Sequence, residues 1–114
     1  MRKIRSTRKP ESSLQTKIIE MLKINDWGVK PTHGNIYQYG LPDLYAFHLH
    51  YGTRWIEVKM PTRTGNIFTP AQLEFFPELA SKGVGVWVLV AASESEYKKL
   101  FKPPNWHSYL EVMR

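Results

Sequence analysis

Two acids and a lysine, with Asp43 separated from Glu57 and Lys59 by a predicted hairpin, have the residue types of a site for a divalent cation. The segments on either side of Tyr51-Gly52 have the composition of β-strands, and this dipeptide is a tight hairpin signal. A hairpin centred there pairs residues whose numbers sum to about 103, which places Asp43 opposite Lys59 or its neighbour. Cross-strand distances of about 5–8 Å then bring the three side chains together.

Alternation within residues 53–60 puts Glu57 and Lys59 on one face of the predicted strand, while Ile56 and Val58 point to the apolar face. Two neighbouring carboxylates repel each other unless a cation or a proton lies between them. Mg²⁺ takes one or two carboxylates and leaves other positions to water and phosphate. A lysine beside it can orient or help to deprotonate an attacking water. These residue types therefore predict metal-assisted hydrolysis of a phosphodiester.

Ordinary structural explanations exist for the same residues. Asp43 follows Pro42, as turn residues often do, and a Glu57–Lys59 pair on a strand surface would contribute little to stability. A second acid-x-lysine triplet occurs at residues 96–98, on a predicted helix with no Pro-Asp hairpin before it, and we interpret it as unrelated to a site.

The order of predicted elements indicates an α/β fold. Thr69 is a predicted N-cap with Gln72 closing a capping box, and the apolar run that starts at Val84 is typical of a strand buried on both faces. A helix that connects two strands implies a parallel or mixed sheet flanked by helices. The predicted elements are a helix over 11–26, a weak strand over 29–33, hairpin strands over 43–50 and 53–60, a helix from 70 to about 82, a strand over 84–91 and a short helix ending at 101. Nothing is predicted for residues 105–114.

Three motifs occur in a specific order, followed by Gly83 before the apolar strand: Gly40-Leu41-Pro42-Asp43-Leu44, Trp55-Ile56-Glu57-Val58-Lys59 and Thr69-Pro70-Ala71-Gln72. With this order and spacing, residues 11–90 resemble the VRR-NUC family, which belongs to the PD-(D/E)XK nuclease superfamily. The sequence departs from the family at Met60-Pro61, where relatives often have Gly-Pro. The resemblance implies a restriction-endonuclease-like core of helix, three strands, helix and strand.

The resemblance also implies a metal site. It predicts Mg²⁺ or Mn²⁺ held by Asp43, Glu57 and the carbonyl of Val58, with Glu11 as a further acidic ligand, directly or through water. Glu11 has an ordinary explanation as well, because an acid in the first turn of a helix is favoured by the helix dipole.

Catalytic roles follow from the same resemblance. Lys59 would activate the attacking water, and Gln72 would position water or phosphate, although a glutamine here is also the expected capping-box partner of Thr69. The implied activity is a metal-dependent DNA endonuclease that is selective for branched DNA such as a flap or a Holliday junction. Small stand-alone relatives resemble Holliday-junction resolvases that act as homodimers, since two symmetric nicks need two sites.

Length and composition set the boundaries of this interpretation. The 114 residues make one domain, predicted over 10–114, and 42% hydrophobic residues exclude a wholly disordered chain. Cysteine is absent, which excludes disulfides, thiol nucleophiles and cysteine-ligated zinc. No apolar run is long enough to span a membrane, and no signal peptide is evident, so we expect a soluble, cytoplasmic protein of a bacterium or a phage-infected cell.

Most of the net charge of +6 belongs to residues 1–9, which contain five basic residues and no acid. Such a tail is usually disordered when free and suits phosphate backbones. The predicted DNA contacts are Arg2, Lys3, Arg5, Arg8, Lys9, Lys30 and Arg63. Two other functions remain open: a catalytically inactive nuclease-fold module that binds DNA, and a small RNA-binding protein that acts through its basic tail.

Two further groups have weaker alternatives. His48 and His50 share a strand face and could bind a metal with His33, although the sequence has no cysteine and no spacing typical of a metal site. Tyr37 and Tyr39 could stack on a splayed base or contribute to packing.

Overall fold

A computed structural model describes residues 10–32, 40–61 and 67–113, without the side chains of residues 10, 11 and 111–113. Its elements are α1 (Pro10–Ile24), β1 (Gly28–Pro31), β2 (Leu44–His48), β3 (Gly52–Val58), α2 (Pro70–Ser81), β4 (Val86–Leu89), α3 (Glu94–Tyr97) and the 3₁₀ helices η2 (Lys98–Phe101) and η3 (Trp106–Met113). In the part of the chain so described, no helix has both the length and the apolar character needed to cross a membrane.

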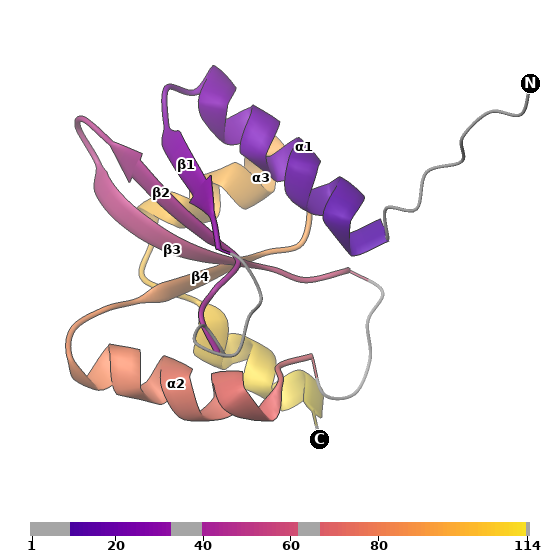
Figure 1. Cartoon of the computed structure of the whole chain (residues 1–114), viewed down its shortest axis with the longest axis vertical. Helices are drawn as coiled ribbons and strands as arrows, with labels where there is room; N and C mark the ends of the chain where they lie inside the picture. The colour runs from indigo at the N-terminus through magenta and orange to yellow at the C-terminus, as the bar shows by residue number, and fades with distance from the viewer. Residues whose placement is uncertain (1–9, 33–39, 62–66, 114) are drawn as a thin grey trace, which may run out of the picture.

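Four strands form one sheet in the order β1-β2-β3-β4. β1, β2 and β3 are antiparallel neighbours, whereas β4 runs parallel to β3 because α2 carries the chain back between them (Figure 1). The predicted α/β class with a mixed sheet flanked by helices is therefore confirmed.

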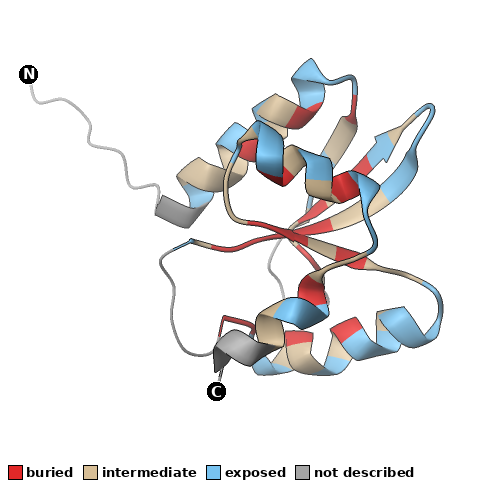
Figure 2. Ribbon diagram, turned by 180° about the vertical axis from the view of Figure 1, so that it is seen from behind, coloured by how far each residue is buried: buried red, intermediate tan, exposed pale blue. Residues whose placement is uncertain are grey.

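Helices cover both faces of this sheet. α1, α3 and η2 lie on one face, and α2 and η3 lie on the other (Figure 1). Buried residues follow the strands and the helix sides turned toward them (Figure 2). Side-chain alternation therefore sends successive residues of β3 into two different cores.

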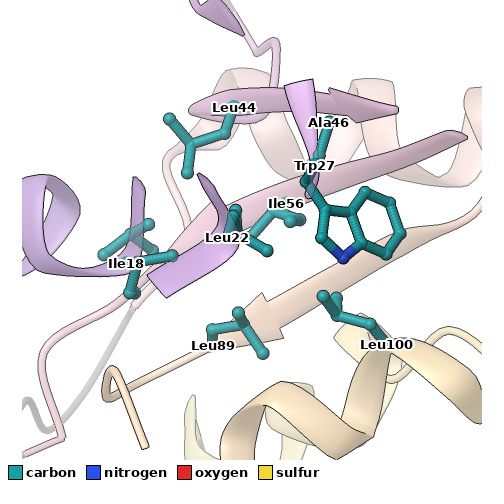
Figure 3. Close-up of a cluster of buried hydrophobic side chains, with 9 residues drawn as sticks. Ile18, Leu22, Trp27, Leu44, Ala46, Ile56, Leu89 and Leu100 are labelled. Carbon is teal, nitrogen blue, oxygen red and sulfur yellow. The ribbon is translucent and has the colours of Figure 1, made fainter. Parts of the chain in front are cut away.

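The first core, on the α1 face, joins α1 to the sheet (Figure 3). Ile18 and Leu22, one turn apart on α1, are fully buried against the strands. Fully burying a side chain of this size contributes about 1.5–3 kcal/mol. Other members of this core are Trp27, Leu44, Ala46, Ile56, Val58, Leu89 and Leu100. Ile56 and Val58 thus face the core that strand alternation predicts.

The second core, on the α2 face, contains Phe76 of α2 and Val86 and Val88 of β4, together with Ile67, Phe68 and Trp106. Trp106 belongs to η3, so the C-terminal segment for which the sequence predicts nothing closes this core. Its ring meets those of Phe68 and Phe76 edge to face, an arrangement that aromatic quadrupoles favour.

The hairpin between β2 and β3 is confirmed, but its predicted register is wrong. Leu44 pairs with Ile56 and His48 with Gly52, so paired residues are three positions away from the predicted register. The turn contains three residues, 49–51, and Gly52 opens β3 with φ 83°. The longer turn moves the pairing, and Asp43 lies opposite Glu57 rather than Lys59.

Side chains occupy the outer edge of β4, the last strand of the sheet. Asn105 accepts a hydrogen bond from the amide of Val88 (2.6 Å) and donates one to the Val88 carbonyl (3.2 Å). Glu96 accepts a hydrogen bond from the amide of Val90 and pairs with Lys99. These contacts satisfy backbone groups that an open edge would offer to other chains. Glu96 of the second acid-x-lysine triplet therefore has a structural role at this edge.

We predict that Asn105→Ala lowers the free energy of unfolding by about 1–3 kcal/mol, because it leaves two part-buried backbone groups of β4 without their partner. Urea unfolding followed by circular dichroism measures the effect. The matched control is Asn25→Ala, which removes an exposed amide contact at the end of α1 and should change stability by less than about 0.5 kcal/mol. Equal effects of the two substitutions would contradict the role assigned to Asn105.

Candidate active site

Asp43 and Glu57 each accept a hydrogen bond from a backbone amide on the other side of the hairpin. The carboxylate of Asp43 accepts a hydrogen bond from the amide of Val58 (2.8 Å), and that of Glu57 accepts one from the amide of Asp43 (3.2 Å). Residues paired on antiparallel strands share a sheet face, so both carboxylates lie on the α2 face. The structure thus places the two predicted acids together and the backbone of Val58 beside them.

The segment before β2 fixes the position of Asp43. Thr32, which follows β1, donates hydrogen bonds to the carbonyls of Pro42 and Asp43. Gly40 has φ 87°, and a Cβ there would lie 2.9 Å from the carbonyl oxygen of Ala71 in α2. Only glycine fits both this backbone conformation and this close approach. The Gly-Leu-Pro-Asp motif therefore joins the start of β2 to the first turn of α2.

The first turn of α2 orients the amide of Gln72. The predicted capping box is confirmed: Thr69 Oγ1 accepts from the amide of Gln72, and Gln72 Oε1 accepts from the amide of Thr69, both at 3.1 Å. With its oxygen held there, Gln72 turns its Nε2 toward Glu57, to which it donates a 2.8 Å hydrogen bond. The capping role and the proposed site role of Gln72 therefore coexist in one side chain.

Lys59 completes the cluster. Its Nζ lies 3.0 Å from Glu57 Oε2, 3.4 Å from Gln72 Oε1 and 5.4 Å from the centre of the Phe68 ring. Glu57 is 2% exposed and Lys59 is 4% exposed, so the alternative of a surface ion pair is wrong. Sequence reasoning missed Phe68, whose only signal is an apolar residue just before a predicted N-cap.

Burial makes the charged form of Glu57 costly. Burial is the larger cause and repulsion from the Asp43 carboxylate the second, and together they raise the pKa of Glu57 from 4.5 to about 8. The Lys59 cation and the hydrogen bonds from Lys59 and Gln72 offset only part of this rise. Glu57 therefore retains a proton at neutral pH unless further positive charge reaches it.

The chemistry of these donors fits Mg²⁺ or Mn²⁺. Two carboxylates with mutual repulsion, next to a backbone carbonyl at Val58, offer the hard oxygen ligands that such ions take together with water. No three His, Cys, Asp or Glu side chains within the described ranges lie close enough to hold a metal by themselves. This donor set suits a cation that completes its coordination with water and substrate.

Of the remaining predicted site residues, the structure describes only Lys30 and the backbone of Glu11. Glu11 is the second residue of α1, and its side chain is outside what the structure describes. Lys30 is exposed on β1, paired with Tyr45 of β2. The other predicted DNA contacts, Arg2, Lys3, Arg5, Arg8, Lys9 and Arg63, lie outside the described residues, as do His33, Tyr37 and Tyr39.

His48 and His50 lie in an aromatic group at the hairpin turn. The Nδ1 of His48 accepts a hydrogen bond from the amide of His50, and the His48 ring lies 4.5 Å from that of Tyr51 and 5.0 Å from that of Trp27. These contacts give His48 a packing role at the α1 face.

Fold and site together define a mixed α/β domain with an acid–acid–lysine cluster held between β2, β3 and α2. A scan against protein-family models and a search of curated proteins find no match. A search of solved structures finds a chain described as a VRR_NUC domain, with a TM-score of 0.59 and 20% sequence identity. The match covers 81% of this chain and 95% of that chain. This chain therefore has the VRR_NUC fold, which confirms the resemblance predicted from the motifs at the level of fold.

We predict that stability declines as the pH rises, because of Glu57. Its raised pKa means that the folded protein keeps a proton that the unfolded chain releases, so the contribution is fully present below about pH 4.5 and is lost as the pH rises through about 8. Glu57→Gln is neutral at every pH and should flatten the decline. Urea unfolding in EDTA between about pH 5 and 8 measures this.

The matched control for this experiment is Glu94→Gln. The side chain of Glu94 is 82% exposed, and its substitution should leave the decline unchanged. A decline as steep in Glu57→Gln as in the unsubstituted protein would show that burial of Glu57 does not control it.

Proposed function

We propose that this protein is a metal-dependent DNA endonuclease that hydrolyses phosphodiester bonds and prefers branched DNA. One observation carries the proposal: Asp43, Glu57, Lys59 and Gln72, from three separate segments, meet on one face of the sheet within hydrogen-bonding distance. Burying Glu57 and Lys59 there, beside the half-buried Asp43, is costly for stability, and such clusters are concentrated at functional sites.

Asp43 and Glu57 would hold the cation together with the carbonyl of Val58. A bound Mg²⁺ would polarise the phosphodiester and lower the pKa of a water molecule. Glu57 would hold such a cation in its charged form, since a nearby cation favours the carboxylate over the protonated acid. Gln72, held by the capping box, limits how far the Glu57 side chain can turn.

Lys59 would orient the attacking water and stabilise negative charge on a phosphoryl oxygen. Its Nζ is already placed at the edge of the carboxylate pair, 3.0 Å from Glu57 Oε2. The ring of Phe68 lies beneath it at 5.4 Å, which restricts the directions in which the ammonium group can move. Lys59 thus has few conformations to lose when a substrate binds.

DNA as the substrate is supported by charge. The exposed Lys30 lies on the sheet face that carries the site, and the sequence concentrates five basic residues in 1–9. Contacts of this kind bind phosphate without reading sequence and weaken as salt concentration rises. We further propose a homodimer, because paired nicks across a four-way junction need two copies of the site.

We predict that Lys59→Met lowers Mg²⁺-dependent cleavage by about 10²-fold or more, since it removes the ammonium group and keeps a side chain of similar length. Cleavage of a four-way junction, a flap, a duplex and a single strand, each with Mg²⁺ and with Mn²⁺, provides the measurement. The control Lys82→Met changes an exposed lysine just beyond α2 and should keep full activity. Equal cleavage by Lys59→Met and the unsubstituted protein, or cleavage of RNA alone, would refute the proposal.

We also predict that a saturating divalent cation raises the melting temperature. A ligand at about 100 times its dissociation constant stabilises the folded state by about 2.7 kcal/mol, which corresponds to about 10 °C for a domain of this size. Differential scanning calorimetry with Ca²⁺ or Mg²⁺ against EDTA measures the shift. Asp43→Asn should abolish it, whereas Asp26→Asn, at an exposed position after α1, should retain it. A shift that survives Asp43→Asn would place the cation elsewhere.

A further inference from the structure

Three aromatic side chains form a continuous strip beside the candidate active site: Tyr45 and Phe47 of β2 and Trp55 of β3. The rings of Tyr45 and Phe47 are stacked, with centroids 5.8 Å apart and an interplanar angle of 16°. The ring of Trp55 lies 4.8 Å from that of Tyr45. We call this group the aromatic strip.

The aromatic strip is open to solvent along β2. Phe47 is 36% exposed, and Tyr45 is partly exposed. Trp55 at the other end packs against the second core, which anchors the strip to the α2 face. Exposed apolar side chains that form one contiguous patch, unlike single scattered ones, are typical of an interaction surface.

Gly28 of β1 leaves room for Phe47. A Cβ at Gly28 would lie 2.4 Å from the Phe47 ring, so the ring occupies the space of the missing side chain. Gly28 and Phe47 are paired across β1 and β2, and the same face of β1 carries Lys30 next to Tyr45. The aromatic strip therefore packs closely against the sheet at Gly28 and has Lys30 as its neighbour on β1.

Strand alternation connects the aromatic strip to the site. Asp43, Tyr45 and Phe47 are every second residue of one strand segment, and Trp55 and Glu57 are every second residue of β3. Because alternate residues of a strand share a face, all five side chains lie on the α2 face. Two residues along a strand correspond to about 6.6 Å. A polymer whose phosphate lies at Asp43 and Glu57 would thus have its neighbouring units over the aromatic strip.

We propose that the aromatic strip stacks unpaired bases of the DNA strand whose phosphate lies in the candidate active site. The inference rests on the proposed function and deepens it, because it names the substrate feature that the protein prefers: an unpaired segment beside the cleaved bond. Aromatic rings bind single-stranded bases through their π-faces, whereas the bases of a continuous duplex are already stacked on each other. Lys30 provides the accompanying contact to phosphate.

A second exposed aromatic pair allows a matched control. Phe101 of η2 is 42% exposed and meets Tyr51 edge to face at 4.7 Å. Tyr51 in turn stacks on Trp27, a member of the first core, so this pair lies on the α1 face. Phe101 therefore matches Phe47 in residue type and exposure and differs from it in its position relative to the site.

The test is the binding of fluorescein-labelled oligothymidylate to the full chain in EDTA, with a blunt hairpin duplex and oligouridylate as comparison probes, measured by fluorescence anisotropy. Phe47→Leu removes the ring and keeps an apolar side chain over Gly28. We expect it to weaken oligothymidylate binding about five-fold or more and to leave duplex binding unchanged. Phe47→Tyr should keep the affinity, and Phe101→Leu should change neither.

Equal oligothymidylate binding by Phe47→Leu and the unsubstituted protein would overturn the inference, as would a loss of the same size in Phe101→Leu or in Phe47→Tyr. A loss of binding confined to oligouridylate would also overturn it. So would a change of oligomeric state in Phe47→Leu, measured by analytical ultracentrifugation. Binding in EDTA requires no cleavage. If the protein proves unable to cut DNA, the stacking result still stands. If stacking fails, the cleavage results with Lys59→Met still stand.

Discussion

Repulsion between the buried carboxylate of Glu57 and the half-buried carboxylate of Asp43 is the constraint on which this structure depends. Asp43 and Glu57 face each other across β2 and β3, and both accept hydrogen bonds from backbone amides of the opposite strand. Burial and this repulsion raise the pKa of Glu57 to about 8 in spite of Lys59 and Gln72. Glu57 therefore keeps a proton at neutral pH, and the divalent cation that we propose for this site would replace that proton with positive charge.

The two faces of the sheet differ in how many buried polar groups they carry. On the α1 face, α1 and η2 enclose a core whose buried members are all apolar. On the α2 face, apolar packing around Phe76 is interrupted by the buried polar cluster, and farther along β2 that face is open at Phe47. Burial of apolar side chains on the α1 face adds to the free energy of unfolding and so offsets the cost of the polar groups and exposed rings on the α2 face. A small domain can accommodate a costly site in this way.

Local signals in the sequence predicted the elements well. The capping box of Thr69 and Gln72, the apolar periodicity of α1 and the apolar run of β4 each depend on neighbouring residues, and all three are present. The hairpin register was predicted incorrectly, because turn length is set by how the chain packs and not by Tyr51-Gly52 alone. The contact of Phe68 with Lys59 had only a weak local signal, an apolar residue before an N-cap, and the contacts of Asn105 with β4 had none.

By itself, the sequence determined which residues have the chemistry for a site and on which strand face Glu57 and Lys59 lie. It also indicated a mixed sheet, from a hairpin followed by a connecting helix. These features could be predicted because strand alternation and helix capping act over a few residues. Only the tertiary structure decided that Asp43 faces Glu57, that Glu57 and Lys59 are buried, and that Gln72 turns its amide toward Glu57. These depend on the packing of α2 against β4 and on the three-residue turn, where segments distant in the chain meet.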